Sequence, residues 1–108
     1  MLSPYKIMWL VVVFDLPVGT KTERRRATGF RNMLIDEGFM MKQFSVYLRA
    51  CPNRPAAEAL ADRIGRRAPP EGDVSIMFFT DKQYGLTQNY AGRTVAEIEK
   101  KPNQFTLF

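Results

Sequence analysis

The chain has 108 residues, enough for one domain, and its ordinary composition excludes low-complexity and fibrous proteins. It contains no histidine, which excludes Ser-His and Cys-His catalysis and every metal site that needs an imidazole ligand. Its one cysteine, Cys51, excludes an internal disulfide and favours a reducing, cytoplasmic environment. The N-terminus lacks the ordered regions of a signal peptide, and the net charge of +5 is compatible with nucleic acid as a partner.

The first apolar segment, residues 7–15, is rich in β-branched and aromatic residues and ends on Asp15. It is shorter than the about 20 residues that span a bilayer, so it predicts a strand buried on both faces. Pro17 cannot donate a hydrogen bond to a sheet, so this strand should stop near Asp15. Two interpretations of Asp15 are open: a turn residue that bonds nearby backbone N–H groups, or a metal ligand.

A helix is expected from the capping box Thr20-Lys21-Thr22-Glu23 to about Glu37, with Gly38 as its C-terminal cap. One face of this helix is apolar, and the other carries more cations than its own acidic residues can neutralise. The predicted nucleic-acid-binding residues are Lys21, Arg24, Arg25, Arg26 and Arg31, which the arginines at 63, 66 and 67 would extend. A solvated helix face is the alternative. Binding here would depend on shape and charge.

The remaining pattern predicts six further elements. Residues 39–49 alternate as one strand, with Tyr47 at a sheet edge or dimer seam, and residues 55–68 form a second amphipathic helix. Residues 73–80 form a strand that is apolar on both faces, and residues 81–86 add a short fourth strand. A short helix is expected at 94–100, before an apolar, strand-like tail at 105–108.

These elements predict an α+β fold: a ferredoxin-like β-α-β-β-α-β-type sandwich, with an antiparallel sheet and two helices on one face. The domain should span residues 1–88, and residues 89–108 should form a C-terminal extension that ends in a partner-docking strand. The tail folding back on its own sheet is the alternative. Because two strands are apolar on both faces, the second face should be covered by another copy in a two-fold homodimer.

The homodimer bears on the chemistry expected of Asp15. A two-fold axis near the ends of the two 7–15 strands would bring Asp15 and its symmetry mate together, so that a bound Mg²⁺ is shared between them. A phosphodiester could then be hydrolysed there. Asp15 is thus the candidate catalytic and metal residue. Cys51 has no imidazole to activate it and is expected to be inert.

Several motifs together resemble the Cas-two family of CRISPR-associated proteins, over nearly the whole chain. They are Phe14-Asp15, the arginine-rich first helix, Gly38-Phe39, Gln43-Phe44-Ser45-Val46-Tyr47 and Asp81-Lys82-Gln83-Tyr84-Gly85. The resemblance implies a ferredoxin-like homodimer that acts with the Cas-one integrase in spacer acquisition. The dimer would bridge integrase subunits and hold protospacer duplex DNA between them.

The resemblance also implies a Mg²⁺-dependent endonuclease activity on double-stranded DNA or single-stranded RNA, with Asp15 as the metal ligand. Ser45 and the helix arginines carry over as neighbours of that site, and Leu107-Phe108 as the end of a strand that pairs with the partner subunit or the integrase. A structural DNA-binding role is favoured, with the nuclease second. The alternative is a small RNA-binding or toxin-like ferredoxin-fold module unrelated to CRISPR, against which the lack of an exposed aromatic stacking face argues. No membrane partner is expected.

Overall fold

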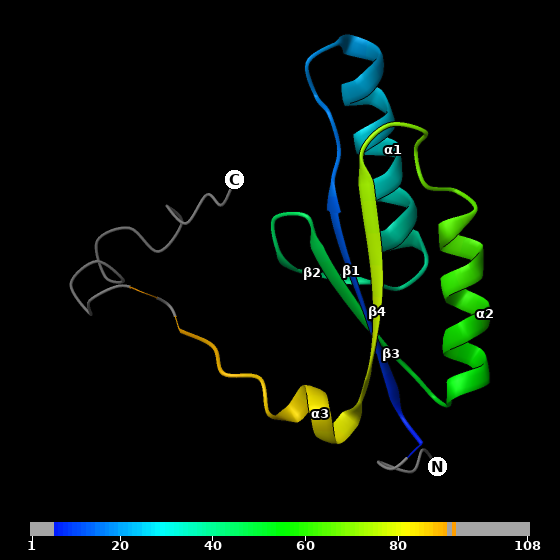
Figure 1. Ribbon diagram of the computed structural model, residues 1–108, viewed down its shortest axis with the longest axis vertical. Helices are drawn as coiled ribbons and strands as arrows, with labels where there is room; N and C mark the ends of the chain where they lie inside the picture. Colours follow the sequence, from blue (N-terminus) through cyan, green and yellow to red (C-terminus); the bar gives the residue numbers. More distant parts are fainter. Residues whose placement is uncertain (1–5, 91, 93–108) are drawn as a thin grey trace.

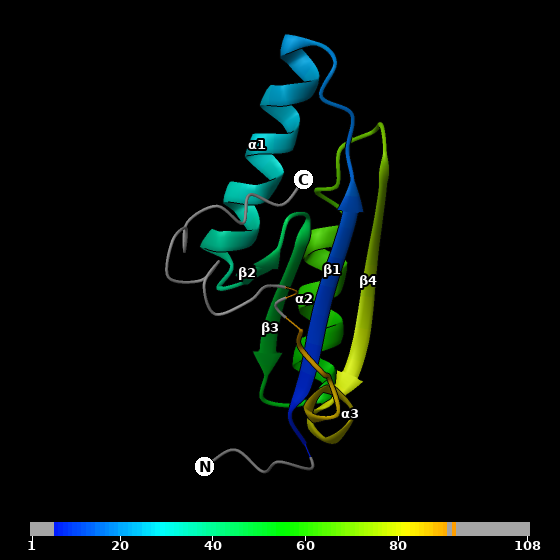
Figure 2. The same cartoon turned by 90° about the vertical axis from the view of Figure 1, so that its left-hand side faces the viewer.

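The computed structural model describes residues 6–90 and residue 92, which form an α+β sandwich (Figure 1). The elements in chain order are β1 (Met8–Asp15), α1 (Lys21–Asp36), β2 (Met40–Gln43), β3 (Val46–Cys51), α2 (Arg54–Gly65), β4 (Asp73–Thr80) and α3 (Asp81–Gly85). The sheet has the order β2-β3-β1-β4, and every neighbouring pair is antiparallel. Helices α1 and α2 cover one face, and α3 lies against the other (Figure 2). The predicted ferredoxin-like β-α-β-β-α-β order is confirmed.

The central strand β1 has apolar side chains on both faces, as its sequence predicts. Met8, Leu10, Val12 and Phe14 belong to the core beneath the two large helices, and Leu10 and Val12 have no exposed surface. The alternate residues, which include Trp9 and Asp15, point to the second face. The core therefore lies between the sheet and the α1–α2 layer, with Asp15 at the end of the strand on the opposite side.

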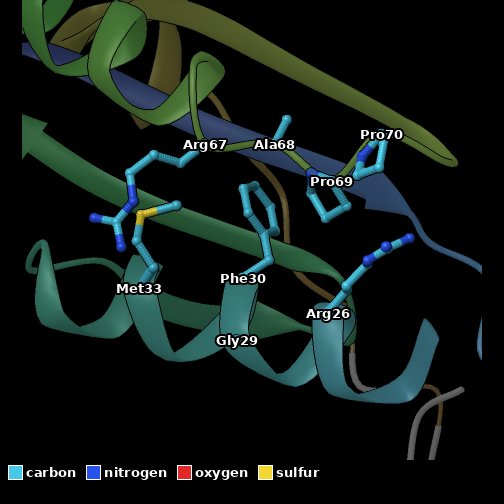
Figure 3. A pocket seen from close by; sticks show the side chains of 8 residues that line it. All are labelled: Arg26, Gly29, Phe30, Met33, Arg67, Ala68, Pro69 and Pro70. Carbon is cyan, nitrogen blue, oxygen red and sulfur yellow. The ribbon is translucent and has the colours of Figure 1, made fainter. Parts of the chain in front are cut away.

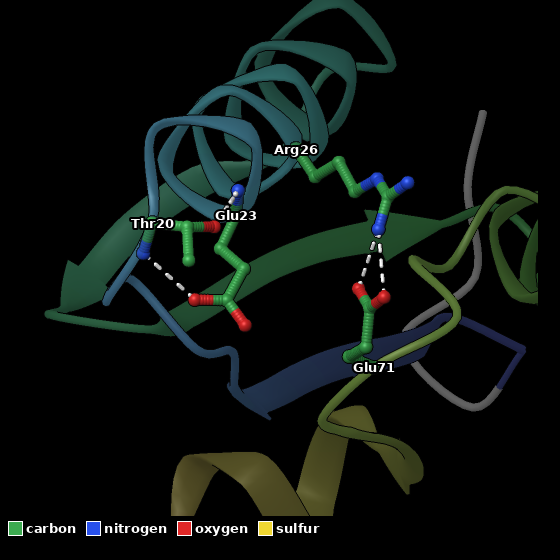
Figure 4. A network of polar contacts seen from close by, with 4 residues as sticks. All are labelled: Thr20, Glu23, Arg26 and Glu71. Atoms are coloured by element: carbon green, nitrogen blue, oxygen red, sulfur yellow. Dashed lines mark hydrogen bonds and ion pairs between the residues drawn. The ribbon is translucent and has the colours of Figure 1, made fainter.

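Helix α1 has the predicted N-terminal cap and apolar stripe. The Thr20 hydroxyl accepts from the Glu23 N–H at 3.1 Å, and the Glu23 carboxylate accepts from the Thr20 N–H at 2.8 Å (Figure 4). The buried residues of the helix are Ala27, Phe30, Met33 and Leu34. Gly38 follows the helix with φ +87°, the left-handed conformation in which glycine carries no Cβ penalty.

The prediction of a single strand over residues 39–49 is wrong, because the segment forms the β2–β3 hairpin. Its two-residue turn is Phe44–Ser45, and Ser45 has φ +60°. Met40 pairs with Leu48, and Met41 with Tyr47. The turn alone would shift the alternation of faces by one residue, but an irregularity in the β2 register between Met41 and Gln43 compensates for it. The alternation therefore continues across the hairpin, and the turn is not visible in the sequence pattern. Tyr47 is also not at an edge: it is 2% exposed and stacks on Phe14 at 5.7 Å between ring centroids.

The predicted strand over residues 81–86 is likewise wrong, because these residues form helix α3. Thr80 and Gln83 form a capping box, which begins a helix directly after β4. The helix is held by Trp9, whose indole N–H donates to Asp81 at 2.8 Å and whose ring stacks on Tyr84 at 4.4 Å. Part of the second sheet face is therefore covered by the chain itself.

The other predicted boundaries agree closely. The strand over residues 73–80 is confirmed, and α2 begins at Arg54 with Asn53 as its cap but ends at Gly65, before the Pro69-Pro70 pair. The proposed helix at 94–100 and tail strand at 105–108 lie outside the described residues. Within the described part of the chain, no helix has the length and apolar character needed to cross a membrane.

Candidate functional site

Asp15 ends β1 with an exposed side chain, and the sheet places a second carboxylate beside it. In the antiparallel pairing of β1 with β4, Asp15 is directly opposite Asp73, the first residue of β4. Directly paired residues project to the same face of a sheet, so the two carboxylates are neighbours on the second face. Asp73 is not among the residues predicted from the sequence. Its place beside Asp15 depends on the register of β4 against β1, which no local pattern reveals.

The loop before β4 packs closely against the end of β1. Gly72 has φ +92°, and a Cβ at this position would lie 2.5 Å from the Asp15 carbonyl oxygen. Only glycine allows this approach, which positions Asp73 against β1. On the other side of β1, the Phe14 N–H donates to the Ser45 carbonyl at 3.1 Å, so the β2–β3 turn also meets the end of the strand. Ser45 is thus a neighbour of Asp15 through its backbone.

The Asp15–Asp73 pair suits a hard cation. Among residues 6–90 and 92, no three Asp, Glu, His or Cys side chains gather as metal ligands. Mg²⁺ nonetheless binds through one or two carboxylates and completes its six positions with water and substrate phosphate. The donor set therefore fits Mg²⁺, and a second copy of the chain would add further carboxylates if it met this end of the sheet.

The five predicted nucleic-acid-binding cations of α1 differ in what they contact. Arg26 is held by Glu71, whose two carboxylate oxygens each accept from its Nη1 at 2.7 Å (Figure 4). Arg24 donates to the Val18 carbonyl at 3.1 Å, and Arg31 donates to the Thr28 hydroxyl at 3.3 Å. These contacts neutralise only Arg26.

The remaining two cations, Lys21 and Arg25, are exposed and make no ion pair within the described part of the chain. They line a shallow hollow of about 470 Å³ on the outer side of α1, here called the outer hollow. Its lining residues are Lys21, Arg24, Arg25, Thr28, Gly29 and Asn32. No carboxylate of the described residues lines this hollow, so these residues present a positive surface there.

The arginines in and after α2 also differ in whether they form an ion pair. Arg63 pairs with Glu37 through hydrogen bonds of 2.8 and 2.9 Å, and this hydrogen bonding holds the pKa of the Glu37 carboxyl below its ordinary value. Arg66 and Arg67 are exposed and have no ion pair among the described residues. Cys51 is buried, and burial raises the pKa of its thiol, which keeps the sulfur in its unreactive protonated form.

The second face of the sheet carries exposed apolar side chains beyond the area that α3 covers. Met40 on β2 is 64% exposed and Met77 on β4 is 39% exposed. By the strand register both lie on the same face as Asp15. Among the described residues, exposed apolar side chains and the carboxylate pair thus share one face of the sheet.

Comparison with known proteins agrees with this geometry. The family described as "CRISPR associated protein Cas2" matches residues 8–87. A protein of Paracidovorax avenae named CRISPR-associated endoribonuclease Cas2 is 50% identical over 108 residues, covering 100% of both chains. A protein of the same name from Flavobacterium psychrophilum is 41% identical, and the match covers 99% of this chain and 93% of that protein.

One solved structure, titled "Crystal structure of cas2", superposes with a TM-score of 0.57. It is 20% identical in sequence, and the match covers 83% of this chain and 92% of that one. At this identity the likeness concerns the fold, and it agrees with the β-α-β-β-α-β order described above.

Proposed function

The chain belongs to the Cas2 family of CRISPR-associated proteins, and from this premise we propose that it binds duplex DNA during spacer acquisition. The observation that carries the proposal is the outer hollow, in which Lys21 and Arg25 have no acidic partner among residues 6–90 and 92. Phosphate groups on a duplex would replace the counterions around these cations, and their release favours binding. In this role the protein positions DNA without reading its bases.

The proposed assembly is a homodimer through the second face of the sheet. The exposed Met40 and Met77 supply apolar area for such a contact. An isologous two-fold contact leaves both copies of α1 on the outside, because α1 lies on the opposite face. The dimer would then offer two cationic surfaces to one duplex and bridge subunits of the Cas-one integrase, as the family resemblance suggests.

The test compares duplex binding by the native chain and by the double variant Lys21→Ala, Arg25→Ala over a range of salt concentrations. The variant should bind more weakly, and the slope of log affinity against log salt should fall by about two. The matched control is Arg54→Ala, Lys82→Ala, which removes the same charge from α2 and α3. An equal loss in both double variants would show that net charge alone governs binding and would contradict the assignment to α1.

A second candidate activity is metal-dependent hydrolysis of phosphodiesters, which the Asp15–Asp73 pair favours. The relatives from P. avenae and F. psychrophilum are named endoribonucleases, so RNA is the first substrate to test and DNA the second. Asp15 and Asp73 would hold Mg²⁺, which supplies Lewis acidity for phosphodiester hydrolysis. With no histidine in the chain, any proton transfer by protein groups must use carboxylate, Lys or Tyr side chains.

Cleavage assays with labelled single-stranded RNA and duplex DNA test this activity. Cleavage should require Mg²⁺, stop with a chelator, and be lost in Asp15→Asn while the folded state is retained. The opposite outcome is that the native protein and the variant bind duplex equally and cleave neither substrate. That result would contradict the hydrolytic activity, keep the DNA-binding role and assign Asp15 to the turn.

A further inference from the structure

Gly29 occupies the interior of α1 without any internal need for glycine. Its side-chain position is open, since an added Cβ would meet no atom within 4 Å. Glycine in a helix interior costs about 1 kcal/mol relative to alanine, and a conformational requirement is absent because the residue is helical. Packing among the described residues therefore does not account for a glycine at this position. Close approach of a molecule outside the chain would account for the glycine.

Gly29 lies between two hollows and lines both of them. The outer hollow carries Lys21 and Arg25. A second hollow of about 360 Å³, here called the inner hollow, lies between α1 and the α2–β4 connection (Figure 3). Its lining residues are Arg26, Gly29, Phe30, Met33, Arg67, Ala68, Pro69 and Pro70. Gly29 is therefore the residue of α1 that the two linings share.

The charges of the two hollows agree in sign. Among the described residues, neither lining contains a carboxylate side chain, and each contains a guanidinium or ammonium group with no ion pair. These groups are Lys21 and Arg25 in the outer hollow and Arg67 in the inner hollow. Arg26 borders the inner hollow but is held by Glu71. A polyanion that crosses α1 would meet cations on both sides and no side chain at the crossing point.

We propose that a strand of the nucleic-acid backbone crosses α1 at Gly29, from Lys21 and Arg25 in the outer hollow to Arg67 in the inner hollow. The helix is about 10 Å wide, so a strand that crosses it can place successive phosphates on its two sides. The phosphates on either side contact the cations, and the backbone between them passes closely over Gly29. This inference rests on the proposed duplex binding and adds its path, together with Gly29 and Arg67 as contact residues.

The direct test fills the crossing point with a neutral side chain. Gly29→Ala and Gly29→Gln should keep or raise the melting temperature, because both residues favour a helix more than glycine does. Duplex affinity should nevertheless fall, by about fivefold to tenfold for Gly29→Gln, which corresponds to one or two lost phosphate contacts. The matched control is Gly65→Gln at the end of α2, where an added Cβ also meets nothing within 4 Å and binding should be unchanged.

A second pair of variants tests the inner end of the path. Arg67→Ala should weaken duplex binding and lower the salt slope by about one. Arg66→Ala should have a smaller effect, since Arg66 is exposed beside Arg67 but does not line the inner hollow. Normal binding by Gly29→Gln and Arg67→Ala, with binding lost in Lys21→Ala, Arg25→Ala, would overturn the path and leave the proposed function standing. Failure of the native chain to bind duplex would overturn both.

Discussion

Asp15 and Asp73 face each other across the β1–β4 ladder, one at the end of its strand and the other at the start. Like charges in this arrangement repel and destabilise a sheet by a few tenths of a kcal/mol to about 1 kcal/mol. A carboxylate pair that costs stability and remains exposed at one end of a sheet is suited to bind a cation. We expect substitutions of Asp15 and Asp73 to affect Mg²⁺-dependent cleavage to different degrees.

Asp73→Asn should raise the Mg²⁺ concentration needed for half-maximal cleavage by about tenfold, while Asp15→Asn should abolish cleavage at every Mg²⁺ concentration. Without Mg²⁺, Asp73→Asn should unfold at a slightly higher urea concentration, because the repulsion is removed. The control is Asp62→Asn, an exposed carboxylate on α2, which should change neither quantity. An unchanged Mg²⁺ dependence in Asp73→Asn would remove Asp73 from the site.

Glu71→Gln should increase duplex affinity by about threefold, because it releases Arg26 for phosphate contact. The Arg26 and Glu71 side chains are 43% and 48% exposed, so breaking their ion pair should cost less than about 1 kcal/mol of unfolding free energy. Glu58→Gln is the matched control, since it breaks the exposed Arg54–Glu58 pair on α2 and removes the same charge. Equal gains in the two variants would show only the effect of net charge.

The sequence predicts best those elements whose determinants are local. The start of α1 follows from Thr20 and Glu23, which are three residues apart, and its buried face follows from spacing alone. The β2–β3 turn was not predicted because the irregularity between Met41 and Gln43 compensates for the shift that the turn at Phe44–Ser45 introduces, so the alternation continues across both strands. Helix α3 was not predicted because five residues are too few to show helical periodicity, although the sequence contains the Thr80–Gln83 capping box.

The candidate site, too, can be predicted from the sequence only in part. Asp15 could be identified because an apolar strand ends on it, and the α1 cations because they share a helix face. The pairing of Asp15 with Asp73 and of Arg26 with Glu71 joins residues far apart in the chain, and each depends on the register of β4 and its preceding loop. No local pattern carries that information. The cations that remain without an ion pair could therefore be distinguished from Arg26 only in the folded structure.

The Glu37–Arg63 pair predicts a dependence of stability on pH. Hydrogen bonding from Arg63 holds the pKa of Glu37 below its ordinary value of 4.5, and the nearby charges of Arg63, Arg67 and Arg49 act in the same direction. A carboxyl group with a lowered pKa stabilises the fold fully above its unfolded pKa, and this contribution is lost as pH falls through the folded value. Glu37→Gln should thus lower the unfolding free energy at pH 7.

The difference between native protein and Glu37→Gln should be constant above about pH 5.5 and shrink as the pH falls below 4.5. Urea unfolding at several pH values measures it. Arg63→Gln should show a pH dependence of the same sign, because it removes the same hydrogen bonds, but a smaller one, because Arg67 and Arg49 still act on Glu37. A difference that instead grows toward low pH would contradict the sign of the shift.

The contact of α3 with Trp9 can be followed by fluorescence, since the chain has one tryptophan. Tyr84 stacks on the Trp9 ring and Asp81 accepts its indole N–H, so both hold α3 on the second face of the sheet. Tyr84→Ala should shift Trp9 emission to the red, as the indole gains contact with water, and cost about 1 kcal/mol of unfolding free energy. Tyr90→Ala is the control, because Tyr90 is 83% exposed and should leave emission unchanged. Unshifted emission in Tyr84→Ala would mean that α3 does not shield Trp9 in solution, and the second face would then be open to a partner over a larger area.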